Sequence, residues 1–247
     1  MTSARTALLA LLLSLPISCT VEKADIGPDG RLDVLGPVPG FVGKGGLPGD
    51  WVIEGPDHAL KDNLSAVTHD RIPALKVTAG KKPFIAALRT QALMLATPYL
   101  SWSWNMEIDD GGRHPVRLVV GFERGKDGSM TWKSRPQDWF GNTLPPHERA
   151  ITIAWGESAL ERGSLHLPKG ADAARRAPRY TARGGRENTY TWWLETVDLA
   201  RIYAQAWPGE DYSRVRITFI GVATDGAAAQ GGGTPPTAYI SGIRLNR

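Results

Sequence analysis

Short apolar runs with a two-residue period recur along this chain, and they constrain its fold more than any other feature. From Trp51 onward, glycine, proline and asparagine separate these runs. The pattern is typical of antiparallel strands, whose successive side chains point to opposite faces of a sheet. Nine such strands predict an all-β sandwich or barrel. The expected strands lie at 51–54, 75–79, 84–89, 100–108, 116–123, 150–155, 189–197, 215–223 and 238–245.

One short helix is expected to interrupt the strands. Asp198 can cap its first turn, and Pro208 with Gly209 ends it. Between them, apolar residues recur at the three-and-four spacing of one helical face, namely Leu199, Ile202, Tyr203 and Ala206. The segments 124–149 and 156–188 carry no comparable pattern, and we expect them to be long loops.

The alternation within each run predicts which side chains enter the core. In the run that starts at Tyr99, leucine, methionine and the pair Trp102 and Trp104 share one face, which is therefore expected inside. Asn105 lies on the other face of this run with serines and Glu107. In the next run Arg117 alternates with apolar residues, which places it on the face turned away from the core.

The run 189–197 carries a tryptophan on each face. Trp192 shares its phase with Leu194 and is expected inside, so Trp193 and Glu195 are expected outside. If this strand neighbours the one that bears Arg117, then Arg117, Trp193, Glu195 and Asn105 share one polar face. Such a face suits a sugar, whose ring stacks on indole while its hydroxyls bind charged and amide groups. The alternative is a solvated face with an Arg117–Glu195 ion pair.

Asp109 and Asp110 precede two glycines and are the strongest candidates for chemistry. Three interpretations stay open: turn formation, calcium binding, or acid and base catalysis with Glu195 or Asp225 as second carboxylate. The five histidines are scattered, and phosphate-loop and dinucleotide motifs are absent from the sequence. No cofactor is therefore predicted, apart from the calcium alternative.

The first nineteen residues have the pattern of an export signal. Arg5 precedes an apolar stretch at 8–17, which is too short for a membrane span. Cys19 is the only cysteine and is expected to carry the lipid of a bacterial lipoprotein; the alternative is cleavage by the ordinary signal peptidase. We therefore expect an exported protein anchored in the envelope, at the periplasm or the outer membrane.

Composition divides the chain into three parts. Residues 1–18 form the predicted signal peptide, the glycine- and proline-rich 19–40 a flexible tether, and 41–247 a single domain. The formal charge of +4 is too small to indicate a nucleic-acid partner. Basic residues crowd 169–186, which we expect to be a mobile loop, either solvated or in contact with anionic lipid headgroups or polyanionic glycans.

The order of these motifs resembles the bacterial family called domain of unknown function 3047. The resemblance implies a jelly-roll sandwich, similar to galactose-binding-like modules and located in the envelope, and implies no established activity. The chain departs from the family pattern after Asp225, where a second acid is missing, and in a longer basic insertion. The matching residues are Leu47-Pro48-Gly49-Asp50-Trp51, Trp102-Ser103-Trp104, Asp109-Asp110, Arg117, Phe122, Trp155-Gly156, Glu195, Tyr203, Trp207 and Asp225.

Three functions follow as hypotheses. The first is a non-catalytic lipoprotein whose sandwich binds a glycan or another envelope component through the polar face around Arg117, Trp193 and Glu195. Asp109 and Asp110 are expected to shape the edge of this face, and Asn105 and Asp225 are further candidate ligand-binding residues. The second is a hydrolase or lyase acting on polysaccharide, with Asp109 or Asp110 and Glu195 as its acids. The third is an envelope assembly or scaffolding lipoprotein. No oligomeric state is predicted.

Overall fold

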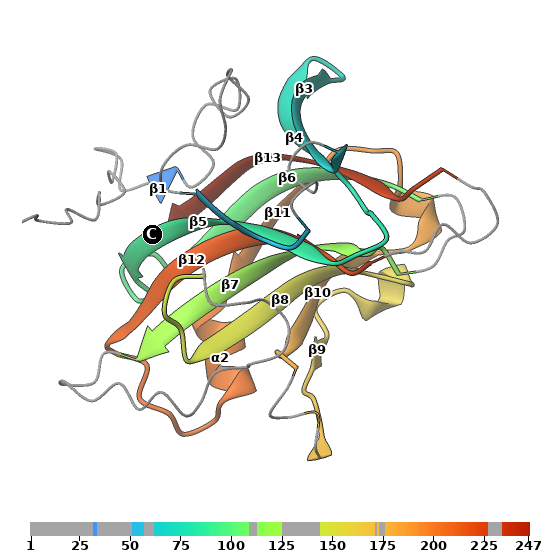
Figure 1. The fold of residues 1–247 in the computed structure, drawn as a ribbon. Coiled ribbons are helices and arrows are strands. Elements are labelled where there is room, and N and C mark those ends of the chain that lie inside the picture. Colours follow the sequence, from blue (N-terminus) through green and yellow to red (C-terminus); the bar gives the residue numbers. More distant parts are fainter. Residues whose placement is uncertain are drawn as a thin grey trace, which may run out of the picture.

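The computed structural model describes residues 32–33, 51–56, 62–108, 113–124, 144–170, 172, 176–226 and 234–247. Within these ranges the chain forms two sheets packed face to face, with one α-helix beside them (Figure 1). The predicted sandwich is confirmed. Among the described residues the two sheets hold thirteen strands, of which only β8 and β10 pair in parallel.

The six-stranded sheet has the spatial order β11-β6-β13-β4-β3, and β1 pairs with β13. Its strands are β11 (Trp193–Asp198), β6 (Tyr99–Glu107), β13 (Thr237–Asn246), β4 (Ile72–Thr78), β3 (Leu64–His69) and β1 (Leu32–Asp33). The seven-stranded sheet has the order β2-β5-β12-β7-β8-β10-β9. Its strands are β2 (Trp51–Glu54), β5 (Phe84–Leu93), β12 (Val215–Thr224), β7 (Val116–Arg124), β8 (Arg149–Gly156), β10 (Arg179–Gly184) and β9 (Leu165–His166).

The predicted helix is α2 (Leu199–Ala206). Asp198 caps it as expected, because its carboxylate accepts a hydrogen bond from the backbone N–H of Arg201 at 2.9 Å. The ring of Tyr203 packs edge-on against Phe122 with 5.3 Å between centroids. The apolar side of α2 thereby joins the core between the sheets.

The core between the sheets contains the tryptophans that the alternation placed inside. Trp102 and Trp104 are fully buried and pack edge-on, with 5.1 Å between their ring centroids. Trp155 of the opposite sheet meets Trp104 at 5.6 Å in a similar geometry. This prediction is confirmed, and the three indoles tie the two sheets together.

The outer face of the seven-stranded sheet carries a second apolar cluster that the alternation did not predict. Its buried members are Ile85, Ala87, Val119, Ala150, Phe219 and Ala223. Leu144 and Ala177 pack over it, so this sheet is covered on both faces. Arg117 points away from the core between the sheets, as the alternation predicted, but it is only 6% exposed because segments without strand pattern cover this face.

The segment 156–188 is not one long loop. It contains η2 (Ala159–Glu161), the strands β9 and β10, and η4 (Arg186–Asn188). Arg179 and Arg183, assigned to a mobile basic loop, instead lie in β10 beside β8. Strand β3 was also not expected; it forms with β4 the hairpin that stands out at the top of Figure 1.

Candidate functional site

Strand β11 presents the opposite faces from those predicted. It starts at Trp193, because residues 189–191 form a turn in which Tyr190 has a φ of 58°. In its register with β6, Trp193 lies opposite Trp104 and Glu195 opposite Trp102. Residues opposite each other in an antiparallel pair share a face. Trp193 and Glu195 therefore point into the sandwich, and Leu194 points outward with 72% of its surface exposed.

Glu195 is held inside by two arginines. Its carboxylate accepts a hydrogen bond from the Arg183 Nε and lies 3.3 Å from a guanidinium nitrogen of Arg162. The Arg183 guanidinium also lies over the Trp193 ring, 3.8 Å from its centroid. Glu195 is 3% exposed, so this ion pair joins the edges of the two sheets and leaves little access for a ligand.

The shared polar face predicted for Arg117, Trp193, Glu195 and Asn105 is not formed. Arg117 lies on β7 of the seven-stranded sheet, whereas the other three lie on β11 and β6 of the six-stranded sheet. β11 pairs with β6 at the edge of its sheet, so the condition that it neighbours the Arg117 strand fails.

Two predicted site residues do meet each other. A guanidinium nitrogen of Arg117 lies 2.6 Å from the Asp225 carboxylate, which is 61% exposed. Asp109 and Asp110 lie outside the described residues, as does Cys19, so the turn, calcium and catalytic interpretations stay predictions.

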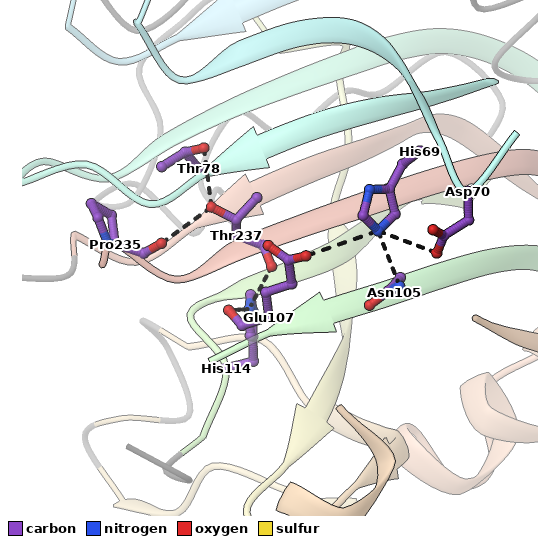
Figure 2. A network of polar contacts seen from close by, with 8 residues as sticks. All are labelled: His69, Asp70, Thr78, Asn105, Glu107, His114, Pro235 and Thr237. Carbon is purple, nitrogen blue, oxygen red and sulfur yellow. Dashed lines mark hydrogen bonds and ion pairs between the residues drawn. The ribbon is translucent and has the colours of Figure 1, made fainter. Parts of the chain in front are cut away.

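A different polar and aromatic surface lies on the outer face of the six-stranded sheet, and of the predicted residues it includes only Asn105. We call it the His69 cluster; it comprises His69, Asn105, Glu107, Trp192 and Tyr239. In β6, Asn105 and Glu107 keep the outward phase that the alternation predicted, and Asn105 lies opposite Tyr239 of β13. His69 reaches them from the end of β3 (Figure 2).

The His69 ring organises the cluster. Its Nε2 lies 3.3 Å from the Asn105 amide nitrogen, 3.8 Å from the Glu107 carboxylate and 3.5 Å from that of Asp70 (Figure 2). The ring stacks on Tyr239 with 3.7 Å between centroids and 3° between planes. The hairpin turn at Asp70 and Arg71 allows this reach, since both residues have positive φ.

The tryptophan of this face is Trp192. Its ring centroid lies 6.0 Å from that of His69, and its ring is partly exposed. Its indole nitrogen has no hydrogen-bond partner in the described ranges. The interpretation of residues 189–197 thus assigned the two tryptophans to the wrong faces, because it extended the strand through a turn.

The electrostatics of the cluster keep the Tyr239 phenol neutral. Burial raises the pKa of Tyr239, and the nearby Glu107 carboxylate raises it further. The phenol therefore stays a hydrogen-bond donor at neutral pH. Together, a partly exposed tryptophan, a phenol, an imidazole and carboxylates can hydrogen-bond to hydroxyl groups and stack on an apolar ring face, while the buried Asn105 amide holds His69.

A second histidine, His114, holds the end of β6 next to the cluster. His114 is buried, its Nδ1 accepts a hydrogen bond from the backbone N–H of Val116, and its Nε2 lies 3.2–3.3 Å from the carbonyls of Glu107 and Thr237 (Figure 2). These partners assign the proton to Nε2 of a neutral ring. His114 thereby fixes the end of β6 that carries Glu107 beside β13.

Sequence reasoning placed Glu107 on the correct face without selecting it, and it missed His69, Trp192 and Tyr239. The register between β6 and β13 brings in Tyr239, and the turn after His69 brings in the imidazole. Neither contact can be recognised from the neighbouring residues in the sequence. The polar residues Asn105 and Glu107, two positions apart, did indicate this face.

The part of the chain that the structure describes contains no group of three or more histidine, cysteine or acidic side chains able to hold a metal ion. No helix in the same ranges is long and apolar enough to cross a membrane.

No family model matches the chain, and no curated protein matches it. The resemblance to domain of unknown function 3047 therefore stays a prediction. The solved structures to which the chain is similar include two family 12 glycoside hydrolases and one carbohydrate-binding module. Endoglucanase 3 of Trichoderma harzianum, from glycoside hydrolase family 12, has 8% identity and a TM-score of 0.41, over 79% of this chain and 89% of that one.

The native family 12 xyloglucanase of Bacillus licheniformis has 7% identity and a TM-score of 0.40, over 80% of this chain and 94% of that one. The family 11 carbohydrate-binding module of Clostridium thermocellum has 8% identity and a TM-score of 0.39, over 82% of this chain and 91% of that one. At such low identities and TM-scores, these similarities say nothing about the ligand or the activity of this chain.

Proposed function

We propose that this protein is a non-catalytic β-sandwich of the bacterial envelope that binds a glycan on the outer face of its six-stranded sheet. One observation carries the proposal: the His69 cluster joins aromatic rings and hydrogen-bonding groups on one sheet face. Trp192 supplies a partly exposed indole, and His69 supplies an imidazole held between Tyr239 and Asn105. A sugar presents the complementary surfaces, an apolar ring face and a rim of hydroxyls.

The rigidity of the cluster favours binding. The His69 ring is stacked on Tyr239 and lies within 4 Å of two carboxylates, so its orientation is set before a ligand arrives. Side chains that are already ordered lose less conformational entropy on binding. Beside the cluster, Tyr190 and Leu194 are exposed and extend its apolar surface.

Glycan-array binding followed by calorimetry on the purified domain tests this function. Trp192→Ala should weaken binding of an array-selected glycan at least tenfold, which is about 1.4 kcal/mol. Tyr99→Ala is the matched control, because Tyr99 is an exposed aromatic on the same strand face at the far end of β6. An equal loss in both variants, or no glycan bound by the wild-type domain, would refute the proposal.

Catalysis in the same cluster is the second candidate function. The observation that favours it is the position of the His69 Nε2 between the carboxylates of Asp70 and Glu107, an arrangement suited to proton transfer. The earlier alternative with Glu195 as an acid lacks support, because that carboxylate is buried between two arginines. Release of new reducing ends from the bound glycan, abolished by His69→Ala, would favour the enzyme over the binding module.

Export and lipidation at Cys19 belong to the proposal and rest on the sequence of the N-terminal segment. Expressed in a bacterium, the full chain should fractionate with membranes, and Cys19→Ser should move it to the soluble fraction. Identical fractionation of both chains would remove the lipid anchor from the proposal.

A further inference from the structure

A second polar site lies on the other side of the molecule, on the outer face of the seven-stranded sheet. Arg117 of β7 lies opposite Ala154 of β8, which lies opposite Thr181 of β10. These three residues form one row on that face, and the two strand spacings put Arg117 and Thr181 about 10 Å apart. In this row of the sheet, Ala154 is the residue between them. Arg179 follows on the same face of β10, two residues before Thr181.

Charged residues gather around this row. We call this region the Arg117 site; it comprises Arg113, Arg117, Arg179, Thr181 and Glu161. Burial lowers the pKa of Arg179, and the guanidinium groups of Arg113 and Arg117 lower it further. Two carboxylates balance them in part, because Asp225 pairs with Arg117 and Glu161 attracts Arg179. Positive charges on one face of a sheet, such as those of Arg117 and Arg179, favour the arrival of an anion.

Two hydrogen-bond donors of this site lack partners within the described part of the chain. The Thr181 hydroxyl is one, and Thr181 is 1% exposed; the Nε of Arg179 is the other. A buried donor without a partner is costly, and in native proteins it calls for an explanation such as a bound group. Both donors point to an oxyanion as that group, because guanidinium and hydroxyl groups bind carboxylate and sulfate oxygens.

One acceptor accompanies these donors. An oxygen of Glu161 is buried and has no partner among the described residues. Gly156 lies directly against it, since a Cβ there would lie 3.0 Å from this oxygen and 2.8 Å from the Thr181 methyl group. A carboxylate repels a simple anion but accepts a hydrogen bond from a hydroxyl. The ligand that satisfies the donors and this acceptor carries both an oxyanion and hydroxyl groups.

We propose that the Arg117 site binds an acidic sugar, with Arg113 and Arg179 on the carboxylate or sulfate group, Arg117 as the fixed charge beneath it, and Glu161 on a ring hydroxyl. Arg113 is exposed, so the site opens to solvent. This site is independent of the His69 cluster, which lies on the opposite outer face.

The test uses the full domain with four small probes: glucuronic acid, glucose, glucose 6-sulfate and sodium sulfate, each followed by NMR or calorimetry. Glucuronic acid or glucose 6-sulfate should bind saturably, and the better of the two identifies the oxyanion. Glucose and sodium sulfate should bind at least tenfold more weakly. Binding should weaken as sodium chloride is raised, because the attraction is electrostatic.

Arg113→Gln should weaken acidic-sugar binding about tenfold without loss of the fold, since Arg113 is exposed. Arg179→Gln should do the same, with circular dichroism as the check on folding. Arg214→Gln is the matched control, because Arg214 is exposed and precedes β12 at the end of the sheet remote from Arg117. Trp192→Ala should leave acidic-sugar binding unchanged, which separates this site from the His69 cluster.

Equal binding of glucuronic acid and glucose would overturn the proposal, as would equal losses in Arg113→Gln and Arg214→Gln. Sodium sulfate binding as well as glucose 6-sulfate would overturn the role of Glu161 and of the sugar ring.

Discussion

The two outer faces of the sandwich differ in what covers them. On the seven-stranded sheet the outward-pointing Phe219 is fully buried beneath Leu144 and its neighbours. On the six-stranded sheet the outward-pointing Leu194 is mostly exposed, and polar groups such as Asn105 and Glu107 surround His69. The first face is a second core, whereas the second face keeps contact with solvent.

This difference between the two outer faces also appears in the burial of alternate residues along each strand. In β7, residues 116–122 are buried in succession, whereas β6 alternates over most of its length. Apolar residues in both phases are typical of strands covered on both faces, and strict alternation is typical of strands with one solvated face. The alternation put Arg117 on the correct face, but its burial was not expected because the strand was taken to be one of the second kind.

The largest expected effect comes from opening the second core. Phe219→Ala should lower the free energy of unfolding by about 3–5 kcal/mol, because it removes a buried ring from a packed site. Urea denaturation of the purified domain measures this. A loss below about 1 kcal/mol would show that the outer cluster of the seven-stranded sheet is not a core.

Gly121→Ala tests the packing within the same face. An added Cβ would lie 2.0 Å from a Phe219 ring carbon, so overpacking should lower stability by about 1–3 kcal/mol. In a Phe219→Ala background the same change should have almost no further cost, since the ring is gone. Additive losses in the double variant would contradict this contact.

Substitution of Glu210 tests whether ionic contacts also stabilise the seven-stranded sheet. Burial acts to raise the pKa of Glu210, but hydrogen bonds from Arg149 at 2.7 Å and Tyr203 at 3.0 Å outweigh it and leave this pKa lowered. The unfolded chain then binds the proton more readily, so stability should fall as the pH drops below about 4.5.

Glu210→Gln should cost about 1–2 kcal/mol at pH 7 and flatten the loss of stability in acid. Thermal unfolding between pH 3 and pH 7 measures both effects, and Glu157→Gln, at an exposed residue, is the control. An unchanged acid profile in the Glu210 variant would assign the acid sensitivity to other groups.

The smallest effect is expected on the solvated face. Leu194→Ser should change stability by no more than about 0.5 kcal/mol, because the side chain is already exposed. Chemical denaturation beside the Phe219 variant measures the contrast. A loss as large as that of Phe219→Ala would mean that this face too is covered, and the comparison between the faces would fail.

Most of the sandwich was predictable from local pattern. β2 has the predicted bounds, the helix after Asp198 is present, and Trp102 and Trp104 are buried as expected. β10 was not predictable, because its sequence is polar and its pairing with β8 and the Arg183–Glu195 contact come from distant parts of the chain. The same holds for the His69 cluster, which three strands and a turn bring together.

By itself, the sequence determined the sandwich, its helix and the tryptophans between the sheets, because each depends on periodicity within a few residues. Only the tertiary structure decided which segments cover the outer face, which tryptophan faces outward and which arginines pair with Glu195. These outcomes depend on the pairing order of the strands, on the register of β11 and on the packing of segments such as 144–147. These outcomes depend on contacts between residues far apart in the sequence, and the pattern within one segment does not specify such contacts.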